Sequence, residues 1–229
     1  MLPVPSNQPV STNVSDIYRR LLNAYGPQYW WSSDSKFEII TGAILTQSTS
    51  WNNADRSVRH LKSIGLLSYS ALCNASEHEI ARAIRPSGFF RRKPKIIMGF
   101  VAHISEIHQG SLTSLLRSDP VKLRQELLSI FGIGPETADN ILVYVAKFPS
   151  FIIDAYTKRI LKRLALDAEA CSYSDWQQVF HKGLKKNTAL FNEYHALLVK
   201  HGKISCKKIP QCIGCCLLEV CPSGLSRVG

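Results

Sequence analysis

Residues 127–154 read LLSIFGIGPETADNILVYVAKFPSFIID, and this stretch decides the fold. Apolar residues recur at three- and four-residue spacing on both sides of the Gly-Ile-Gly turn at 132–134, which predicts two helices joined by a short turn. An Asp-Pro pair at 119–120 opens the first helix, and Pro135 opens the second in the same way. The glycines allow a close approach of the main chain to another molecule, and the amides at the following helix start can hold a phosphate.

A turn of this kind also occurs between two helices of an ordinary protein core. The residues downstream of the turn are therefore needed to distinguish a DNA-binding hairpin from an ordinary one. Taken together, Gly132, Gly134, Thr137, Ala138 and Asp154 resemble the helix-hairpin-helix signature of the endonuclease III superfamily of DNA glycosylases. The resemblance implies that the hairpin grips a phosphate of duplex DNA. It also implies that the aspartate after the second helix is catalytic.

Glu136 departs from the family pattern. In the bifunctional members the residue before the Thr-Ala pair is a lysine that attacks the sugar, and this chain has a glutamate there. A carboxylate cannot form the Schiff base that β-elimination requires. The sequence therefore predicts a glycosylase without AP lyase activity.

Asp154 lies just before a predicted helix at 157–166. A carboxylate in that place is a good helix cap, and capping alone is a sufficient reason for its presence. The two roles do not exclude each other. In the family the aspartate both caps the helix and faces the cleft, so the resemblance implies that Asp154 stabilises the positive charge on the sugar or orients the attacking water.

Two further stretches, GAILTQSTSW at 42–51 and RPSGFF at 85–90, resemble the 3-methyladenine DNA glycosylase III branch of the family. In that branch, aromatics at the positions of Trp30, Trp31 and Trp51 line the pocket for the damaged base, and Lys203 falls where the branch has a pocket lysine. A positively charged alkylated purine gains from stacking and cation–π attraction between indole faces. The alternatives are an aromatic lid over the core and a lysine that ends a surface helix.

Other residues are predicted to contact DNA. The resemblance implies that Gln47 fills the gap left in the duplex by the extruded nucleotide. Arg91, Arg92 and Lys93 belong to the densest positive run, which reads either as a strand-contacting loop or as a solvated helix start. The resemblance favours the loop.

Four cysteines, Cys206, Cys212, Cys215 and Cys221, lie within sixteen residues near the C-terminus. Zinc sites with four cysteine ligands usually have two Cys-x2-Cys pairs, and this loop has one, so a [4Fe-4S] cluster fits better than zinc or free thiols. The endonuclease III cluster loop is similar, with six residues rather than five in its first gap. The cluster is expected to be structural, fixing the loop so that two adjoining lysines, Lys207 and Lys208, reach the phosphate backbone.

Composition agrees with a polyanionic partner without proving one. The chain of 229 residues has a net charge of +11 and a pI near 9.4. It contains no apolar run long enough to cross a bilayer, and residues 1–14 lack the pattern of a secretion signal. We expect a cytoplasmic, nucleoid-associated monomer that binds double-stranded DNA containing damaged bases.

The expected architecture is all-α with two lobes. Residues 1–13 read as a flexible tail. The resemblance implies a six-helix barrel lobe at 28–148, with the helix-hairpin-helix at about 121–146, and an iron–sulfur lobe formed by 14–27 and 149–229. A cleft between the lobes is expected to hold the site. Outside the hairpin, periodicity predicts helices at 14–25, 37–47, 54–66, 77–86, 95–109, 157–166, 174–185 and 187–202.

Three functions compete. The first is a monofunctional glycosylase of base excision repair, which extrudes alkylated purines of the 3-methyladenine type and hydrolyses their N-glycosidic bond. The second is a bifunctional endonuclease III-like glycosylase and AP lyase, or a mismatch glycosylase. The third is a non-catalytic iron–sulfur DNA-binding protein, which Asp154 and the hairpin together make the least favoured of the three.

Overall fold

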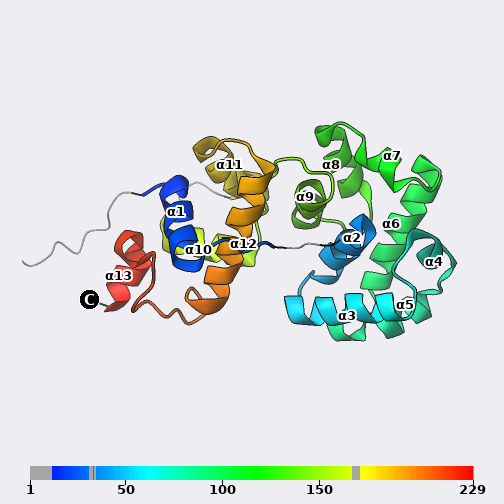
Figure 1. Ribbon diagram of the computed structural model, residues 1–229, viewed down its shortest axis with the longest axis horizontal. Helices are drawn as coiled ribbons and strands as arrows, with labels where there is room; N and C mark the ends of the chain where they lie inside the picture. The colour runs from blue at the N-terminus through cyan, green and yellow to red at the C-terminus, as the bar shows by residue number, and fades with distance from the viewer. Residues whose placement is uncertain (1–11, 31–32, 34, 167–170, 229) are drawn as a thin grey trace, which may run out of the picture. The chain divides into compact units, whose positions relative to one another are not determined.

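The computed structural model describes residues 12–30, 33, 35–166 and 171–228 (Figure 1). Every regular element in these ranges is a helix, so the expectation of an all-α fold is confirmed. Within the same ranges, no helix is long and apolar enough to cross a membrane. Residues 1–11 of the predicted tail, and Trp31, lie outside the described residues. The helices are α1 (Val14–Tyr25), α2 (Lys36–Leu45), α3 (Trp51–Ser63), α4 (Tyr69–Asn74), α5 (Glu77–Ala83), η1 (Arg85–Ser87), α6 (Lys93–His108), α7 (Leu112–Leu116), α8 (Pro120–Ser129), α9 (Pro135–Tyr144), α10 (Ala155–Arg163), α11 (Tyr173–Gly183), α12 (Thr188–Ile204), η2 (Leu218–Val220) and α13 (Pro222–Val228).

The chain forms two compact units. Residues 31–148 make one, called the hairpin unit because it contains α8 and α9. Residues 1–30 and 149–229 make the other, called the cysteine unit because it contains the four clustered cysteines. Each unit has its own apolar interior, and each carries part of the chemistry that the sequence predicts.

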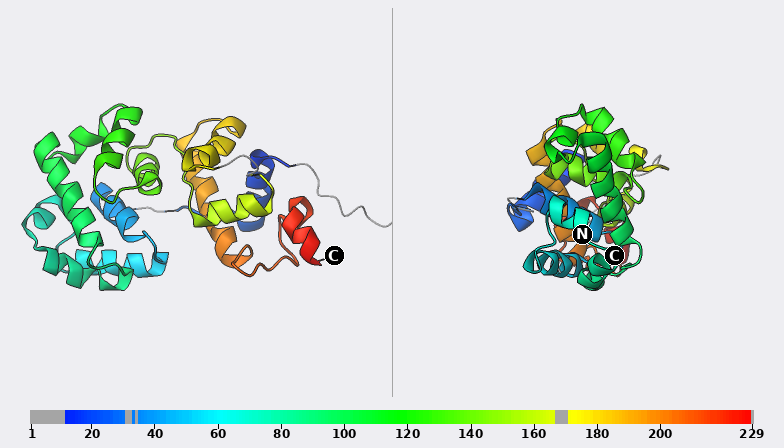
Figure 2. Two further views of the ribbon diagram at one scale, coloured as in Figure 1. Left: turned by 180° about the vertical axis from the view of Figure 1, so that it is seen from behind. Right: turned by 90° about the vertical axis from the view of Figure 1, so that its right-hand side faces the viewer.

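The hairpin unit is built around α2. This helix is apolar on nearly all sides and is buried from Phe37 to Leu45 apart from one position, as expected for a helix that runs through a core. It packs against α3, α6 and α9 (Figures 1 and 2). The turn that follows α2 carries Gln47, so the central helix of the unit places that residue.

The two hairpin helices are joined by a partly buried ion pair as well as by apolar packing. Asp119 caps α8 by accepting hydrogen bonds from the backbone of Val121 and Lys122. On the inner side, Arg124 of α8 donates two hydrogen bonds, of 2.8 and 3.2 Å, to the carboxylate of Asp139 in α9. The Asp139 side chain is fully buried, and a bidentate pair of this kind fixes the relative placement of the two helices.

The cysteine unit is built around α12, which packs against α10 and α1. Its core contains a group of packed aromatic rings among aliphatic side chains. The rings of Phe151 and Phe180 stack with centroids 3.6 Å apart, and Tyr194 of α12 meets both edge-on. Because Phe151 lies three residues before Asp154, this packing anchors the chain that enters α10. The two edge-on contacts of Tyr194 have a favoured aromatic geometry, whereas the Phe151 and Phe180 rings stack nearly face to face.

Lys93 corrects the interpretation of the positive run as a set of phosphate contacts. Its side chain is buried, and its ammonium donates hydrogen bonds of 2.8 and 2.7 Å to the carbonyl oxygens of Leu45 and Ser87. Lys93 therefore ties the end of α2 to the end of η1 and cannot serve as a surface cation. The sequence interpretation failed because exposure in a charged run is decided by tertiary packing. Arg91 and Arg92 are exposed and stay predicted DNA contacts.

Burial of Lys93 predicts a distinct pH dependence of stability. Burial lowers the pKa of Lys93 to about 8 from the ordinary 10.5. Between pH 8 and pH 10.5 the Lys93 amine is protonated in the unfolded chain but largely neutral in the folded protein. The free energy of unfolding therefore rises with pH across this range. Below pH 8 the full cost of burying the ammonium is present. The unfolding free energy of wild type minus that of Lys93→Met is expected to increase from pH 8 to pH 10.5, measured by urea denaturation. The neighbouring, exposed Lys95→Met is the control, and a flat difference for Lys93→Met would contradict the assignment.

Candidate functional site

The hairpin turn exposes main chain because of its two glycines. Gly132 has φ +78°, a left-handed value that favours glycine, and a Cβ atom there would lie 2.5 Å from Cδ1 of Ile96. Gly134 begins α9 as its N-cap and supplies no side-chain hydrogen bond to the first turn, and a Cβ at this position would meet nothing within 4 Å. The N-terminus of α9 thus presents its end of the helix dipole to an open surface, which suits an anion.

Gln47 contacts the hairpin directly. Its side-chain amide donates hydrogen bonds of 3.0 Å each to the carbonyl oxygen of Gly132 and the hydroxyl of Thr137. In the structure, which contains no DNA, this residue links the turn after α2 to the hairpin. The sequence-based role of Gln47 in the duplex stays a prediction, while the structure brings Gln47, Gly132 and Thr137 into one group.

Glu136 is the second residue of α9, in the first turn after Gly134, and it is exposed. Trp51 is the first residue of α3 in the same unit, after Ser50, whose hydroxyl caps that helix. The remaining pocket residues, Trp30, Lys203 and the acid Asp154, belong to the cysteine unit. The predicted site residues therefore form two groups, which are described separately.

Asp154 is the N-cap of α10, and its two carboxylate oxygens have different surroundings. Oδ1 accepts a hydrogen bond of 2.7 Å from the backbone amide of Thr157. Oδ2 lies 3.8 Å from Nε2 of His195, a buried residue of α12. Since capping occupies Oδ1 alone, the carboxylate retains a second oxygen for chemistry. The acid is mostly buried, with 13% of its side chain exposed.

His195 is a site residue that the sequence interpretation missed. Burial lowers its pKa, and the nearby charge of Asp154 opposes that shift only in part. The imidazole is therefore neutral at neutral pH, so it does not form a full ion pair with the Asp154 carboxylate. A single histidine in an apolar helix gives no sequence signal for this contact, because α12 places it opposite Asp154 only in the folded unit.

Lys203 and Trp30 meet near the same acid. The ammonium of Lys203 lies 5.3 Å from the centroid of the Trp30 ring, within the range of a cation–π contact. Partial burial lowers the pKa of Lys203, and the negative charge of Asp154 opposes the shift. The structure thus places an indole face, an amine and a carboxylate from the predicted list in one electrostatic group. The same indole face already holds a cation.

The four cysteines of the predicted cluster line one cavity in the cysteine unit. The empty space measures about 410 Å³, including the part open to solvent, and Arg163 and His201 also line it. In the described part of the chain, all the cysteines are free thiols, and no three cysteine sulfurs come within 4.8 Å of one another.

Arg163 holds the cysteine loop in place. It donates hydrogen bonds to Sγ of Cys206 at 3.1 Å and to the carbonyl oxygens of Lys207 and Lys208 at 2.7 and 2.9 Å. The cationic donor favours a thiolate at Cys206, as a metal ligand requires. The two lysine side chains are exposed. Arg163 therefore anchors the loop that presents both predicted phosphate contacts.

Comparisons with known proteins identify the family. Residues 41–186 match the model of the HhH-GPD superfamily base excision DNA repair protein. A Methanocaldococcus jannaschii protein named as a DNA repair glycosylase is 41% identical over 209 residues, which cover 90% of this chain and 94% of that protein. The region shared with the family model contains the hairpin and Asp154.

Solved structures support the same assignment. The H. pylori 3-methyladenine DNA glycosylase, bound to 1,N6-ethenoadenine, is similar with a TM-score of 0.73 and 26% identity, covering 84% of this chain and 98% of that one. A trapped endonuclease III–DNA covalent intermediate has a TM-score of 0.81 at 19% identity, covering 94% and 97%, and shows the shared fold. The chain belongs to the HhH-GPD superfamily of base excision DNA repair proteins and is a DNA glycosylase.

Proposed function

We propose that this glycosylase is monofunctional and releases alkylated purines from duplex DNA by hydrolysis. The observation that carries the proposal is the group formed by Trp30, Lys203 and Asp154, in which an indole face accepts a cation next to a carboxylate. The similarity to a 3-methyladenine glycosylase, at 26% identity over nearly the whole of that chain, supports the same substrate class.

Recognition depends on the charge of the damaged base. An alkylated purine carries a positive charge, so it gains cation–π attraction on the Trp30 face in addition to stacking. Stacking contributes about 1–3 kcal/mol per aromatic, and extrusion from the duplex costs a few kcal/mol. The base competes with Lys203 for the indole face or occupies the opposite face. An undamaged base lacks the charge and gains less.

Bond cleavage needs one acid from the protein. As the N-glycosidic bond breaks, its electron pair moves to the purine and neutralises the charge of the ring, while positive charge develops on the sugar. The Asp154 carboxylate stabilises that charge, and water then adds to the sugar carbon as the carboxylate accepts the proton of the water. A cationic leaving group needs no protonation, so the site has no requirement for a general acid.

The absence of lyase chemistry follows from Glu136. The residue at this place in α9 has no amine, so it cannot form the covalent Schiff base that precedes β-elimination. The proposed product is a free purine and an intact abasic strand. Lys203 is the amine to be tested as an alternative nucleophile, because it lies near Asp154 with a lowered pKa.

The placement of four cysteines around one cavity supports the proposal of a [4Fe-4S] cluster. Cys206, Cys212, Cys215 and Cys221 would hold it. The loop has one Cys-x2-Cys pair rather than the two that are usual in four-cysteine zinc sites, and this sequence spacing favours the larger group. A cluster bound by four cysteines has no open coordination position, so its contribution is structural. Arg163 would connect it to the backbone of Lys207 and Lys208.

The test of substrate class is a panel of duplexes that each contain one lesion. Purified protein is incubated with duplexes carrying 3-methyladenine, 7-methylguanine, 1,N6-ethenoadenine, an oxidised pyrimidine or a mismatch, and released base is quantified. We expect release of the cationic methylated purines, and a selective loss of that release in Trp30→Ala. Release of oxidised pyrimidines or mismatched bases with no release of alkylated purines would contradict the proposal.

The two hairpin glycines separate DNA binding from stability. Gly132→Ala is expected to lower the free energy of unfolding by about 1–3 kcal/mol, because the alanine would have a left-handed backbone and its methyl group would clash with Ile96.

Gly134→Ala adds a methyl group that meets no protein atom, so the free energy of unfolding is expected to fall by less than about 1 kcal/mol. Its added methyl group blocks the phosphate, and the Kd for duplex is expected to rise about tenfold or more. Unchanged affinity in Gly134→Ala would show that the hairpin does not contact DNA.

A further inference from the structure

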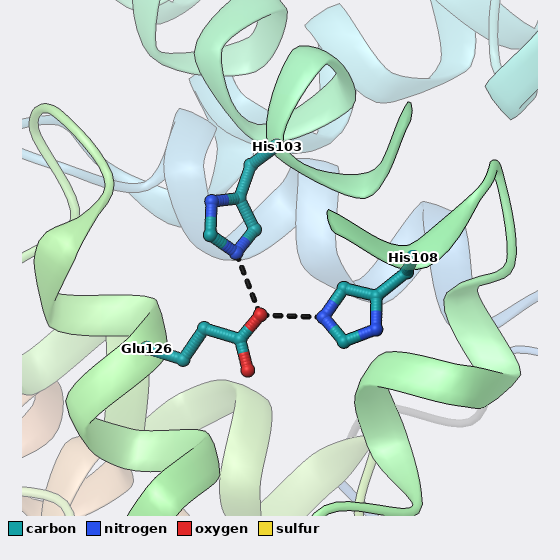
Figure 3. Close-up of side chains that lie close together, drawn as sticks. All are labelled: His103, His108 and Glu126. Atoms are coloured by element: carbon teal, nitrogen blue, oxygen red, sulfur yellow. Dashed lines mark hydrogen bonds and ion pairs between the residues drawn. The ribbon is translucent and has the colours of Figure 1, made fainter. Parts of the chain in front are cut away.

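Two histidines and a glutamate converge at one point of the hairpin unit, away from the hairpin turn. His103 and His108 belong to α6, and Glu126 belongs to α8 (Figure 3). Both rings direct Nε2 to the same carboxylate oxygen, at 2.7 Å from His103 and 2.5 Å from His108. In the part of the chain that the structure describes, no other trio of possible metal ligands is as compact.

The surroundings of the trio are those of a partly enclosed site. The exposed fraction of the side chain is 19% for His103, 10% for His108 and 20% for Glu126. The three side chains are therefore partly accessible to solvent while they remain in contact with one another. Nδ1 of His108 lies 3.2 Å from the hydroxyl of Ser114. In the ion-free state Nε2 of His108 donates to Glu126. With a metal bound at Nε2, the ring proton would lie on Nδ1 and be donated to Ser114, which is how outer-shell partners orient histidine ligands.

The donor set matches a known preference. Two imidazole nitrogens and one carboxylate oxygen are ligands that zinc accepts, with a fourth position left to water. Ligands at about 2.0–2.2 Å around a tetrahedral ion lie roughly 3.4 Å apart. The two Nε2 atoms now lie 2.7 and 2.5 Å from the Glu126 oxygen. Side-chain rotations that move these atoms apart by less than about 1 Å would make room for the ion.

The charge state also suits a cation. Burial raises the pKa of Glu126, but the hydrogen bonds from His108 and His103 outweigh it and the net shift is downward. The carboxylate is therefore ionised at neutral pH. In the ion-free arrangement two imidazoles share one acceptor oxygen, and binding of a metal would replace both hydrogen bonds with stronger ligand bonds.

We propose that His103, His108 and Glu126 bind one divalent transition-metal ion of the zinc type. The ion joins the end of α6 to α8, the first helix of the DNA-binding hairpin. Its role is structural: it fixes α8 against the helix that also carries Ile96 under the hairpin turn. The proposal stands independently of the lesion that the enzyme releases.

The test is a zinc count on matched variants of the full chain. Each protein is dialysed against chelator, then equilibrated with zinc chloride, and bound zinc per chain is measured by mass spectrometry. Zinc held elsewhere, including at the cysteines, is common to all variants and cancels in the difference. We expect wild type to bind one more zinc per chain than His108→Ala and Glu126→Gln. The exposed His78→Ala is the control and is expected to match wild type.

Two further measurements make the result decisive. Zinc is expected to raise the Tm of wild type and of His78→Ala by more than that of Glu126→Gln, which keeps the shape of the side chain. Ser114→Ala is expected to bind zinc about tenfold more weakly, as removal of an outer-shell partner typically causes. Equal zinc counts in wild type, His108→Ala and Glu126→Gln would overturn the proposal, as would a comparable loss of zinc in His78→Ala.

Discussion

Replacement of Asp154 by asparagine is expected to reduce base release by about 10²–10⁴-fold while leaving DNA affinity and stability nearly unchanged. The amide removes the negative charge that stabilises the sugar and accepts the proton of water. It keeps the helix cap, because asparagine and aspartate are about equally good N-caps and the amide oxygen can still accept from Thr157. Single-turnover base release and duplex binding, measured on the same preparation, check both parts.

Asp119→Asn is the matched control for this substitution. Asp119 caps α8 through its side chain as Asp154 caps α10, but it has no proposed contact with the reacting sugar. A general effect of losing a capping charge would lower activity in both variants. Full activity in Asp154→Asn, or equal losses in the two variants, would show that Asp154 acts only as a cap.

The second large effect concerns the cysteine cavity. Cys212→Ala is expected to abolish the visible absorbance of an iron–sulfur cluster and to reduce bound iron from about four atoms per chain to near zero. Without the cluster, the loop that carries Lys207 and Lys208 loses its fixed conformation. The slope of log affinity against log salt falls by about 1 for every lysine that no longer reaches a phosphate, so the slope is expected to fall by up to about 2.

Cys171→Ser is the control for the cysteine substitution. Cys171 is exposed and does not line the cavity, so this variant is expected to retain iron, colour and the wild-type salt slope. Zinc in place of iron in the wild-type protein would contradict the cluster assignment. Disappearance of the cluster in Cys212→Ala with an unchanged salt slope would refute the role of the loop in phosphate binding.

Local chemistry explains why the hairpin could be predicted from sequence. Proline fixes the backbone for a first helical turn, and Pro120 and Pro135 do begin α8 and α9. Asp154 caps α10 as its position before the helix predicts. These signals lie within a few residues of the feature that they determine. The helices α4 and α7 were not predicted, because five or six residues are too few to show a helical period.

Contacts between distant residues could not be predicted. The basic neighbours of Lys93 predict a surface cation, and only folding brings the carbonyls of Leu45 and Ser87 to its ammonium. His195 likewise meets Asp154 across 41 positions of sequence through the packing of α12 on α10. Periodicity reports which face of a helix is apolar, but it does not report which polar groups meet across the interface.

The central proposal for this enzyme is base release without covalent attack on the sugar. The direct measurement is incubation of wild-type protein with a duplex that contains one methylated purine, with and without borohydride. Released base, strand cleavage and covalent complex are then scored separately, and Lys203→Met is run in parallel. The account predicts released purine, an intact abasic strand and no covalent complex. A borohydride-trapped complex or a nicked strand would contradict it, and loss of that complex in Lys203→Met would identify the amine responsible.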